Sequence, residues 1–378
     1  MARRYPAAFI RGGTSKALVF HAHDLPSDRA EWDAIFLRAM GSPDRYGRQL
    51  NGMGGGVSSL SKVCVVGPPT REDADVDYTF AQVQVQHASV DYSGNCGNMS
   101  SAIGPFAIDE RLLPEPPDGE ATVRIHNTNT RKLIHARFRV LGGKAVEEGG
   151  LAIPGVDGTG APVRLDFLRP GGASTGRLLP SGAAAEVLRI PGFGEVEVSL
   201  VDAANACVFV DAASLGLSGN ESPDALAARP GLQQLMQDLR HHGSVAMGIA
   251  ANLEAAAANR MIPLIAVVSA PQDTQTLDGQ RIAAADCDLV VRMVSNGQWH
   301  RALPLTGALC TAVAMQIDAS IPARLARPTA IADATTIAMP SGVLTVAAHV
   351  AREAGGWNAA SGAFYRTTRR LFDGFVYA

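Results

Sequence analysis

The chain has 378 residues, of which 47% are hydrophobic, and its 33 basic and 36 acidic residues give a net charge of −3. That length allows two domains of ordinary size or one large one. The near-neutral charge argues against a nucleic-acid binder, and no apolar run reaches the roughly 18 residues of a membrane span. Arg11 interrupts the first apolar stretch too early for an export signal, so we expect a cytoplasmic protein.

Short β-branched or alternating runs, which are typical of strands, dominate the chain. Strands are predicted at residues 63–66, 78–85, 122–125, 133–140, 196–201, 206–210, 264–268, 289–294 and 342–347. Helices are predicted at residues 30–40, 97–113, 223–239 and 307–317, the third with Ser222 as N-cap and a break at Pro230-Gly231. Neighbouring strands joined by Gly/Asn turns favour an α+β protein with a mixed or antiparallel sheet.

The two halves of the chain carry a weak internal repeat. In the first half, a turn at 94–98 precedes a helix and strands at 121–126 and 133–140. In the second half, a turn at 305–307 precedes a helix and strands at 335–339 and 343–350. We therefore expect two similar domains with a cleft between them, joined somewhere in residues 183–190.

The turn Asn95-Cys96-Gly97-Asn98 is the sharpest chemical feature of the sequence. It lies at the predicted start of a helix, where unpaired N–H groups stabilise a thiolate and attract anions. Gly97 lets the backbone approach a ligand, and the asparagines offer donors and acceptors. An ordinary turn with a buried cysteine is the alternative, and the residues alone do not decide between the two.

Lys62 opens an apolar, strand-like run. Burial favours the neutral amine, which can act as a general base. A solvated lysine at a strand end is the commoner alternative. The glycines just before it, Gly52 and residues 54–56, could cradle an anion, although they match no nucleotide-binding motif.

Two further glycine turns combine hydroxyl and backbone N–H groups that suit a carboxylate, although each could equally be a simple loop. The first contains Arg11, Thr14, Ser15 and Lys16, and the second contains Ser174. Cys64, Cys207, Cys287 and Cys310 lie in apolar contexts and are predicted to be buried and inert. The cysteines and histidines form no ligand cluster, so neither a disulfide framework nor a metal site is expected.

Taken together, several motifs resemble the PrpF-type isomerases, a family that includes methylaconitate, methylitaconate and 4-oxalomesaconate isomerases. The motifs are Arg11-Gly-Gly-Thr-Ser-Lys16, Gly41-Ser-Pro-Asp44, Asn51-Gly-Met-Gly-Gly55, Ser61-Lys62, Asp75-Val-Asp-Tyr78, Asp91-Tyr-Ser-Gly-Asn-Cys-Gly-Asn98, Gly104-Pro-Phe-Ala-Ile108, Ile125-His-Asn-Thr-Asn129, Leu179-Pro-Ser-Gly182, Ile262-Pro-Leu264, Ala270-Pro-Gln-Asp273 and His300-Arg-Ala302. The resemblance covers nearly the whole chain, and the form of the cysteine motif is closer to the methylaconitate branch.

The resemblance implies the fold of diaminopimelate epimerase, with two pseudo-symmetric domains, each a curved mixed sheet around a central helix. It gives an N-terminal domain at 1–186, to which a C-terminal strand at 366–378 returns, and a C-terminal domain at 187–365. It also implies a site between the domains that needs no cofactor. In that site Lys62 matches the family's proton-transfer base, and Cys96 matches the cysteine of the first-domain turn.

One departure from the superfamily pattern is informative. Two-thiol epimerases carry a second cysteine just before a Thr-Gly turn, whereas this chain has Pro304 near that place, ahead of Thr306-Gly307. Cys310 lies three residues beyond Gly307, inside the predicted helix. A two-cysteine amino-acid epimerase is therefore disfavoured.

These features predict an enzyme that isomerises an unsaturated di- or tricarboxylate, such as 2-methylaconitate or aconitate, by moving an allylic proton. Lys62 transfers the proton, and Cys96 is its partner or positions the substrate. The expected substrate-binding residues are Arg11, Thr14, Ser15, Lys16, Asn95, Gly97, Asn98, Ser174, Thr306 and Gly307. The alternatives are a double-bond shift in methylitaconate or 4-oxalomesaconate, an amino-acid epimerase of the same fold, and a non-catalytic carboxylate-binding protein. A homodimer is the expected assembly.

Overall fold

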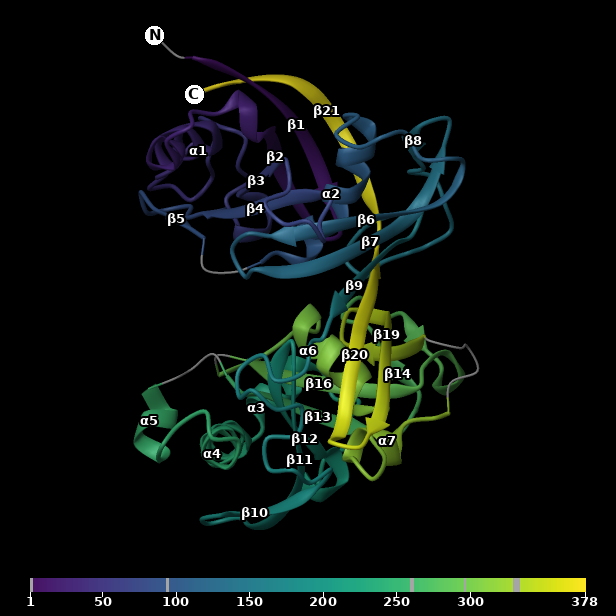
Figure 1. Ribbon diagram of the computed structural model, residues 1–378. Helices are drawn as coiled ribbons and strands as arrows, with labels where there is room; N and C mark the ends of the chain where they lie inside the picture. Colours follow the sequence, from purple (N-terminus) through teal and green to yellow (C-terminus); the bar gives the residue numbers. More distant parts are fainter. Residues whose placement is uncertain (1–2, 93–94, 259–261, 296, 329–333) are drawn as a thin grey trace. The chain divides into compact units, whose positions relative to one another are not determined.

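The computed structural model describes residues 3–92, 95–258, 262–295, 297–328 and 334–378, so Ser93 and Gly94 of the cysteine motif lie outside the described residues. The chain divides into two compact units, Met1–Leu168 with Tyr365–Ala378, and Arg169–Phe364. The C-terminal strand β21 (Thr368–Tyr377) lies beside β1 (Arg4–Gly12) in the first unit (Figure 1). No helix among the described residues is long and apolar enough to cross a membrane.

The first unit ends at Leu168, earlier than the boundary expected after residue 186. The stretch that follows Leu168 is held by the backbone of the second unit. Gly172 N donates to Asp202 O at 2.8 Å, and Asp202 N donates to Leu178 O at 2.9 Å. These bonds assign the glycine-rich stretch to the second unit, which no local sequence signal indicated.

The first unit is a mixed sheet wrapped around helix α2 (Gly97–Asp109). Besides β1 and β21, its strands are β2 (Ser15–His21), β3 (Lys62–Gly67), β4 (Val76–Val83), β5 (Val90–Asp91), β6 (Gly119–Asn127), β7 (Lys132–Leu141), β8 (Lys144–Ala145) and β9 (Val163–Leu168). They pair in the order β21–β1–β2–β3–β4–β6–β7–β9, with β2–β3 and β4–β6 parallel. Helix α2 contacts both β21 and β9, at opposite ends of that order, so the sheet curves around it.

Helix α2 is buried almost all round, as a central helix must be. A Cβ on Gly104 would come within 2.7 Å of the Phe138 ring and 2.9 Å of Ala136, so this glycine lets the helix lie close against β7. The helix ends four residues before the predicted end. Arg111 takes a left-handed φ of 55°, and Leu112 N bonds to Ala107 O at 2.9 Å, a pattern that terminates helices.

Helix α1 (Trp32–Met40) packs on the other face of the same sheet. Its Phe36 ring stacks on Phe20 of β2 with centroids 5.8 Å apart. The apolar cluster on this face also includes Val63 and Val65 of β3. The first turn of the predicted helix is instead a 3₁₀ helix at Arg29–Glu31.

The second unit is built in the same way around helix α6 (Leu305–Ala314), which contacts β11, β12 and β19. Its strands are β10 (Glu186–Ile190), β11 (Gly194–Ala203), β12 (Asn205–Asp211), β13 (Leu264–Ser269), β16 (Leu289–Ser295), β17 (Gln298–Trp299), β18 (Thr335–Met339), β19 (Gly342–Glu353) and β20 (Gly356–Arg366), with a separate pair β14 (Thr274–Gln275) and β15 (Arg281–Ile282). The other helices are α3 (Pro223–Ala228), α4 (Leu232–Ala246), α5 (Leu253–Ala258) and α7 (Ile321–Leu325). Ser222 caps α3 as predicted, and the predicted break separates α3 from α4.

The two units share one strand order. In the second unit the strands pair as β10–β11–β12–β13–β16–β18–β19–β20, and β12–β13 and β16–β18 are the parallel pairs. Each strand in these two orders therefore has a counterpart in the other unit, with β2 matching β12, β3 matching β13 and α2 matching α6. This confirms the α+β class and the two pseudo-symmetric domains that the repeat predicted.

Candidate active site

Lys62 is a buried lysine, with only 8% of its surface exposed. It is the first residue of β3 and lies between Ala17 of β2 and Gln82 of β4. Its Nζ donates to Gln82 Oε1 at 2.5 Å and lies 5.0 Å from the centroid of the Phe80 ring. The alternative of a solvated strand-end lysine is therefore wrong.

The side chain of Lys62 lies on the face of the sheet that α2 covers. Val63 and Val65 belong to the apolar cluster on the α1 face, and side chains alternate along a strand, so Lys62 and Cys64 face α2. Cys64 Sγ bonds to the Tyr78 hydroxyl at 3.8 Å. Burial raises the pKa of both Cys64 and Tyr78, which leaves the two groups uncharged at neutral pH.

Cys96 is the N-cap residue of α2, as the sequence predicted. Its carbonyl accepts hydrogen bonds from Ser100 N at 2.9 Å and Ser100 Oγ at 3.1 Å. Burial raises the pKa of Cys64 most, the neighbouring Cys96 raises it further, and Lys62 lowers it. Cys96 therefore caps the helix that covers the sheet face on which Lys62 lies. Cys96 is only partly buried, whereas the other four cysteines are buried.

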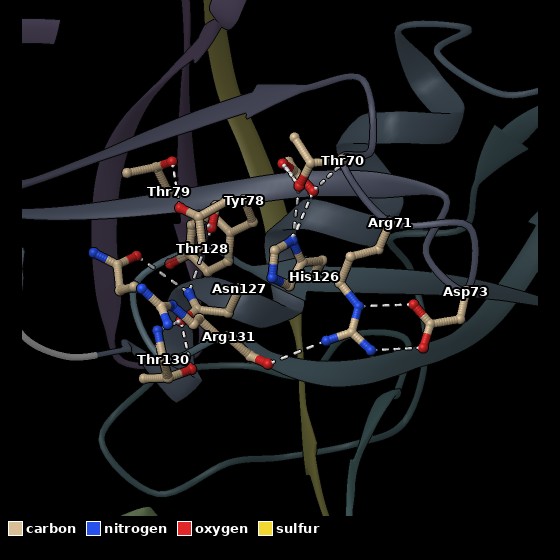
Figure 2. A network of polar contacts seen from close by, with 12 residues as sticks. Thr70, Arg71, Asp73, Tyr78, Thr79, His126, Asn127, Thr128, Thr130 and Arg131 are labelled. Atoms are coloured by element: carbon tan, nitrogen blue, oxygen red, sulfur yellow. Dashed lines mark hydrogen bonds and ion pairs between the residues drawn. The ribbon is translucent and has the colours of Figure 1, made fainter.

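Asn95 of the turn is held by two residues, Ser100 and Asn127, to which the sequence analysis assigned no role. Asn95 Oδ1 accepts from Ser100 Oγ at 3.2 Å and from Asn127 Nδ2 at 3.3 Å. Asn127 is fully buried at the end of β6, where its own Oδ1 accepts from Thr130 (Figure 2). Its place in the motif at 125–129 is the signal that could have marked it.

Asn98 joins the first turn of α2 to the tip of the β1–β2 hairpin. Its Nδ2 donates to Thr14 Oγ1 at 3.1 Å, and its Oδ1 accepts from Thr14 N at 3.4 Å. Its Oδ1 also accepts from Arg366 Nε at 3.0 Å. Arg366 is 6% exposed, and burial lowers its pKa to about 10, so it remains a cation at neutral pH beside the helix N-terminus. No sequence motif had indicated Arg366.

Arg11 and Lys16 do not join this group. They pair with each other across the hairpin, and alternation puts them on the face opposite Ser15, which is buried on the α2 side. The Arg11 guanidinium donates to Gly13 O at 3.1 Å and Thr367 O at 2.9 Å, and Lys16 Nζ lies 5.7 Å from the Phe9 ring centroid. Their contacts hold the hairpin and the last strand together, on the sheet face away from Lys62, and their role in binding stays a prediction.

The glycine loop before Lys62 is filled by a side chain. Gln49 is buried, and its Oε1 accepts from Gly56 N at 2.9 Å and from Ser61 Oγ at 2.6 Å. A Cβ on Gly54 would overlap the Gln49 amide. The loop therefore packs around Gln49, and the expected anion cradle is not formed there.

Ser174, Thr306 and Gly307 belong to the second unit. Ser174 N and Thr175 N donate to Asp202 Oδ2 at 2.8 and 2.7 Å, so these amides of the glycine turn bind a carboxylate of the chain itself. Thr306 lies in the first turn of α6 and accepts from Asn205 Nδ2 at 3.5 Å. A Cβ on Gly307 would come within 2.5 Å of Met293 Sδ, so this glycine is required for packing.

The shared strand order shows which residues replace Lys62 and Cys96 in the second unit. Leu264 opens β13 and pairs with the third residue of β12, as Lys62 opens β3 and pairs with the third residue of β2. Pro304 caps α6, as Cys96 caps α2. Cys310 is buried inside α6, with its Sγ 3.4 Å from Val201 O. At these matched positions the first unit carries an ionisable pair, and the second unit carries Leu264 and Pro304.

The histidines and acidic residues form no comparable centre. Within the described ranges, no group of three His, Cys, Asp or Glu residues is close enough to hold a metal ion. His126 and Asp77 form a buried pair at 2.8 Å, and Thr70 Oγ1 donates to Asp77 Oδ2 at 2.8 Å. Figure 2 shows Thr70 beside the His126 ring. Asp77 and Tyr78 are consecutive in β4, so this pair lies on the face away from α2.

The chain matches known proteins over its full length. The family described as "PrpF protein" matches residues 2–378. The 3-methylitaconate isomerase of Eubacterium barkeri is 39% identical over 99% of this chain and 97% of its own length. The 2-methyl-aconitate isomerase of Cupriavidus necator is 36% identical over 99% and 96%. A crystal structure of methylitaconate-delta-isomerase superposes with a TM-score of 0.92 at 40% identity, covering 100% of this chain and 96% of the other.

A more distant structure bears on the fold alone. The hydroxyproline epimerase of Agrobacterium vitis superposes with a TM-score of 0.51 at 12% identity, over 99% of this chain and 93% of the other. This likeness confirms the epimerase-like fold that the resemblance implied. The family match over the whole chain and the two relatives above 30% identity establish the rest: this protein belongs to the PrpF family and is an isomerase.

Proposed function

We propose that this enzyme isomerises an unsaturated di- or tricarboxylate by removing and returning an allylic proton. The Lys62 amine takes the proton, the C–H bond breaks, and its electron pair spreads over the allyl frame and a carboxylate. The former double bond gains single-bond character and rotates. A proton returned to the same carbon gives the other geometric isomer, and one returned to the far carbon gives a shifted double bond.

The observation that carries this proposal is the buried Lys62 on the sheet face that α2 covers, because Cys96 caps the start of that same helix. A lysine shielded from water can cycle between amine and ammonium as a general base and acid. In this proposal Cys96 protonates the anion or positions the substrate.

Anion stabilisation in the proposal comes from the start of α2. A helix N-terminus offers unpaired N–H groups and partial positive charge, and the buried Arg366 adds a full charge beside Asn98. We propose that the substrate carboxylates are held there by Thr14, Ser15, Asn95, Gly97 and Asn98. The exposed Thr14 and half-buried Asn98 leave room for such contact.

The first substrates to consider are 2-methylaconitate and aconitate, which would undergo cis–trans isomerisation. The second candidate is a double-bond shift in methylitaconate or 4-oxalomesaconate. The similarity to the isomerase of Eubacterium barkeri, at 39% identity, favours testing methylitaconate alongside the aconitates. Both reactions pass through the same allylic anion, so one experiment distinguishes them by where the proton returns.

That experiment is NMR of each acid with the enzyme in D₂O. We expect isomerisation with deuterium entering the allylic carbon, and a loss of at least about 10²-fold in Lys62→Ala. Lys132→Ala, which removes an exposed lysine of β7, should retain full activity. Deuterium exchange without isomerisation would support Lys62 as the base and show that the tested acid is not the substrate. Neither exchange nor isomerisation with any of the acids would refute the proposal.

A further inference from the structure

We infer that Gln82 is a positioning residue that aims Lys62 at the substrate and keeps it able to release its proton. This inference rests on the proposed function of Lys62 as the base. Gln82 lies directly across from Lys62 in the antiparallel pair β3–β4, so both side chains share the face covered by α2. The contact between their side chains, at 2.5 Å, is direct.

The orientation of the Gln82 amide is determined by its surroundings. Its Nε2 lies 3.0 Å from Ser58 O, 3.0 Å from Ser61 O and 3.4 Å from Val83 O. Backbone carbonyls only accept hydrogen bonds, so the NH₂ group must face them. The amide oxygen is then left facing Lys62 and serves as a fixed acceptor.

The loop that supplies these carbonyls is itself anchored. Ser61 Oγ bonds to the buried Gln49, and Ser61 O accepts from Val83 N at 3.1 Å. Gln82 therefore connects this anchored loop to the Lys62 amine and fixes the position of the amine relative to the loop. Phe80, two residues earlier on the same strand, packs its ring under the same amine.

The neutrality of Gln82 matters as much as its position. Both an amine and an ammonium group donate hydrogen bonds, so an amide oxygen holds Lys62 in either state. A carboxylate at the same place would stabilise the ammonium and reduce the fraction of free base. A glutamine thus fixes the direction of the amine while its charge state stays free to change.

Two variants separate these roles. Gln82→Met keeps the length of the side chain but removes the acceptor, and we expect kcat to fall about tenfold to 100-fold with little change in KM. Gln82→Glu should move the acidic limb of the kcat/KM profile upward by about one pH unit or more, with activity recovered at alkaline pH. Gln86→Glu adds the same charge at an exposed position and should leave the profile in place.

A second measurement does not depend on turnover. The chain contains four lysines, so ¹³Cε-lysine labelling gives four NMR signals, and Lys62→Arg assigns that of Lys62. We expect the Lys62 signal to titrate at higher pH in Gln82→Glu than in wild type, and to titrate unchanged in Gln86→Glu. An unchanged Lys62 titration in Gln82→Glu, or a Gln82→Met enzyme as active as wild type, would overturn the inference. If Lys62→Ala alone retained full activity, the proposed function would fail instead.

Discussion

At the scale of single residues, Cys96 differs from the other cysteines in both place and access. It is half-buried at the start of α2, whereas Cys64, Cys207, Cys287 and Cys310 are buried. We expect iodoacetamide to alkylate one thiol per native chain and to inactivate the enzyme, because Cys96 alone among the five cysteines is accessible to the reagent. All five thiols should react in urea. Intact-mass and peptide mass spectrometry would test this, with Cys96→Ala as the unlabelled control. Native labelling of another cysteine would contradict it.

The sequence indicated the candidate catalytic residues more readily than the residues that hold them in place. Lys62 and Cys96 could be singled out from the sequence, because a lysine before an apolar run and a cysteine between asparagines are unusual local patterns. Gln82 and Arg366 can be identified only from the folded structure. Gln82 lies 20 positions from its partner Lys62, and Arg366 lies 268 positions from its partner Asn98. The position of Arg11 and Lys16 on the face away from Lys62 could not be predicted, because a motif does not show which face of a hairpin each side chain takes.

At the scale of elements, the tip of the β1–β2 hairpin packs closely against the first turn of α2 because Gly13 has no side chain. This glycine has a φ of +51°, and a Cβ there would overlap the Asn98 amide and come within 2.9 Å of Arg366. Gly13→Ala should therefore destabilise the fold by about 2–3 kcal/mol and weaken substrate binding. Urea unfolding and KM would measure the two effects.

Gly142→Ala is the matched control, because Gly142 has a similar φ of +59° with nothing within 4 Å of the added Cβ. This substitution should lower the free energy of unfolding by about 1 kcal/mol, the cost of a side chain at positive φ, and leave KM unchanged. Equal losses of stability in the two variants would show that the Cβ added at residue 13 does not clash with the Asn98 amide.

The elements themselves were largely readable from local pattern. Strands such as β3 and β13 are short apolar runs, and the Pro-Gly break between α3 and α4 follows directly from residue chemistry. The boundary at Leu168 was not readable, because it depends on hydrogen bonds between residues 170–178 and β11.

At the scale of the whole molecule, the two units repeat one topology but not one chemistry. Leu264 and Pro304 stand where Lys62 and Cys96 stand in the first unit, so the second unit offers neither counterpart of the base nor of the thiol. A two-base racemase needs acid and base groups on opposite faces of its substrate. Here both candidate groups come from the first unit, and we predict that proton removal and return take place on one face of the substrate.

One-face chemistry makes a quantitative prediction for the allylic methylene of aconitate or 2-methylaconitate. A base on one side removes and replaces only the hydrogen that points toward it. In D₂O, uptake should therefore stop at one deuterium per methylene, even after many turnovers. Transfer from two faces would invert the carbon at each exchange and eventually replace both hydrogens. NMR and mass spectrometry of the recovered acid during a long incubation would count the deuterium. A second deuterium entering at a rate comparable to the first would refute one-face transfer and require a further acid outside the Lys62–Cys96 pair.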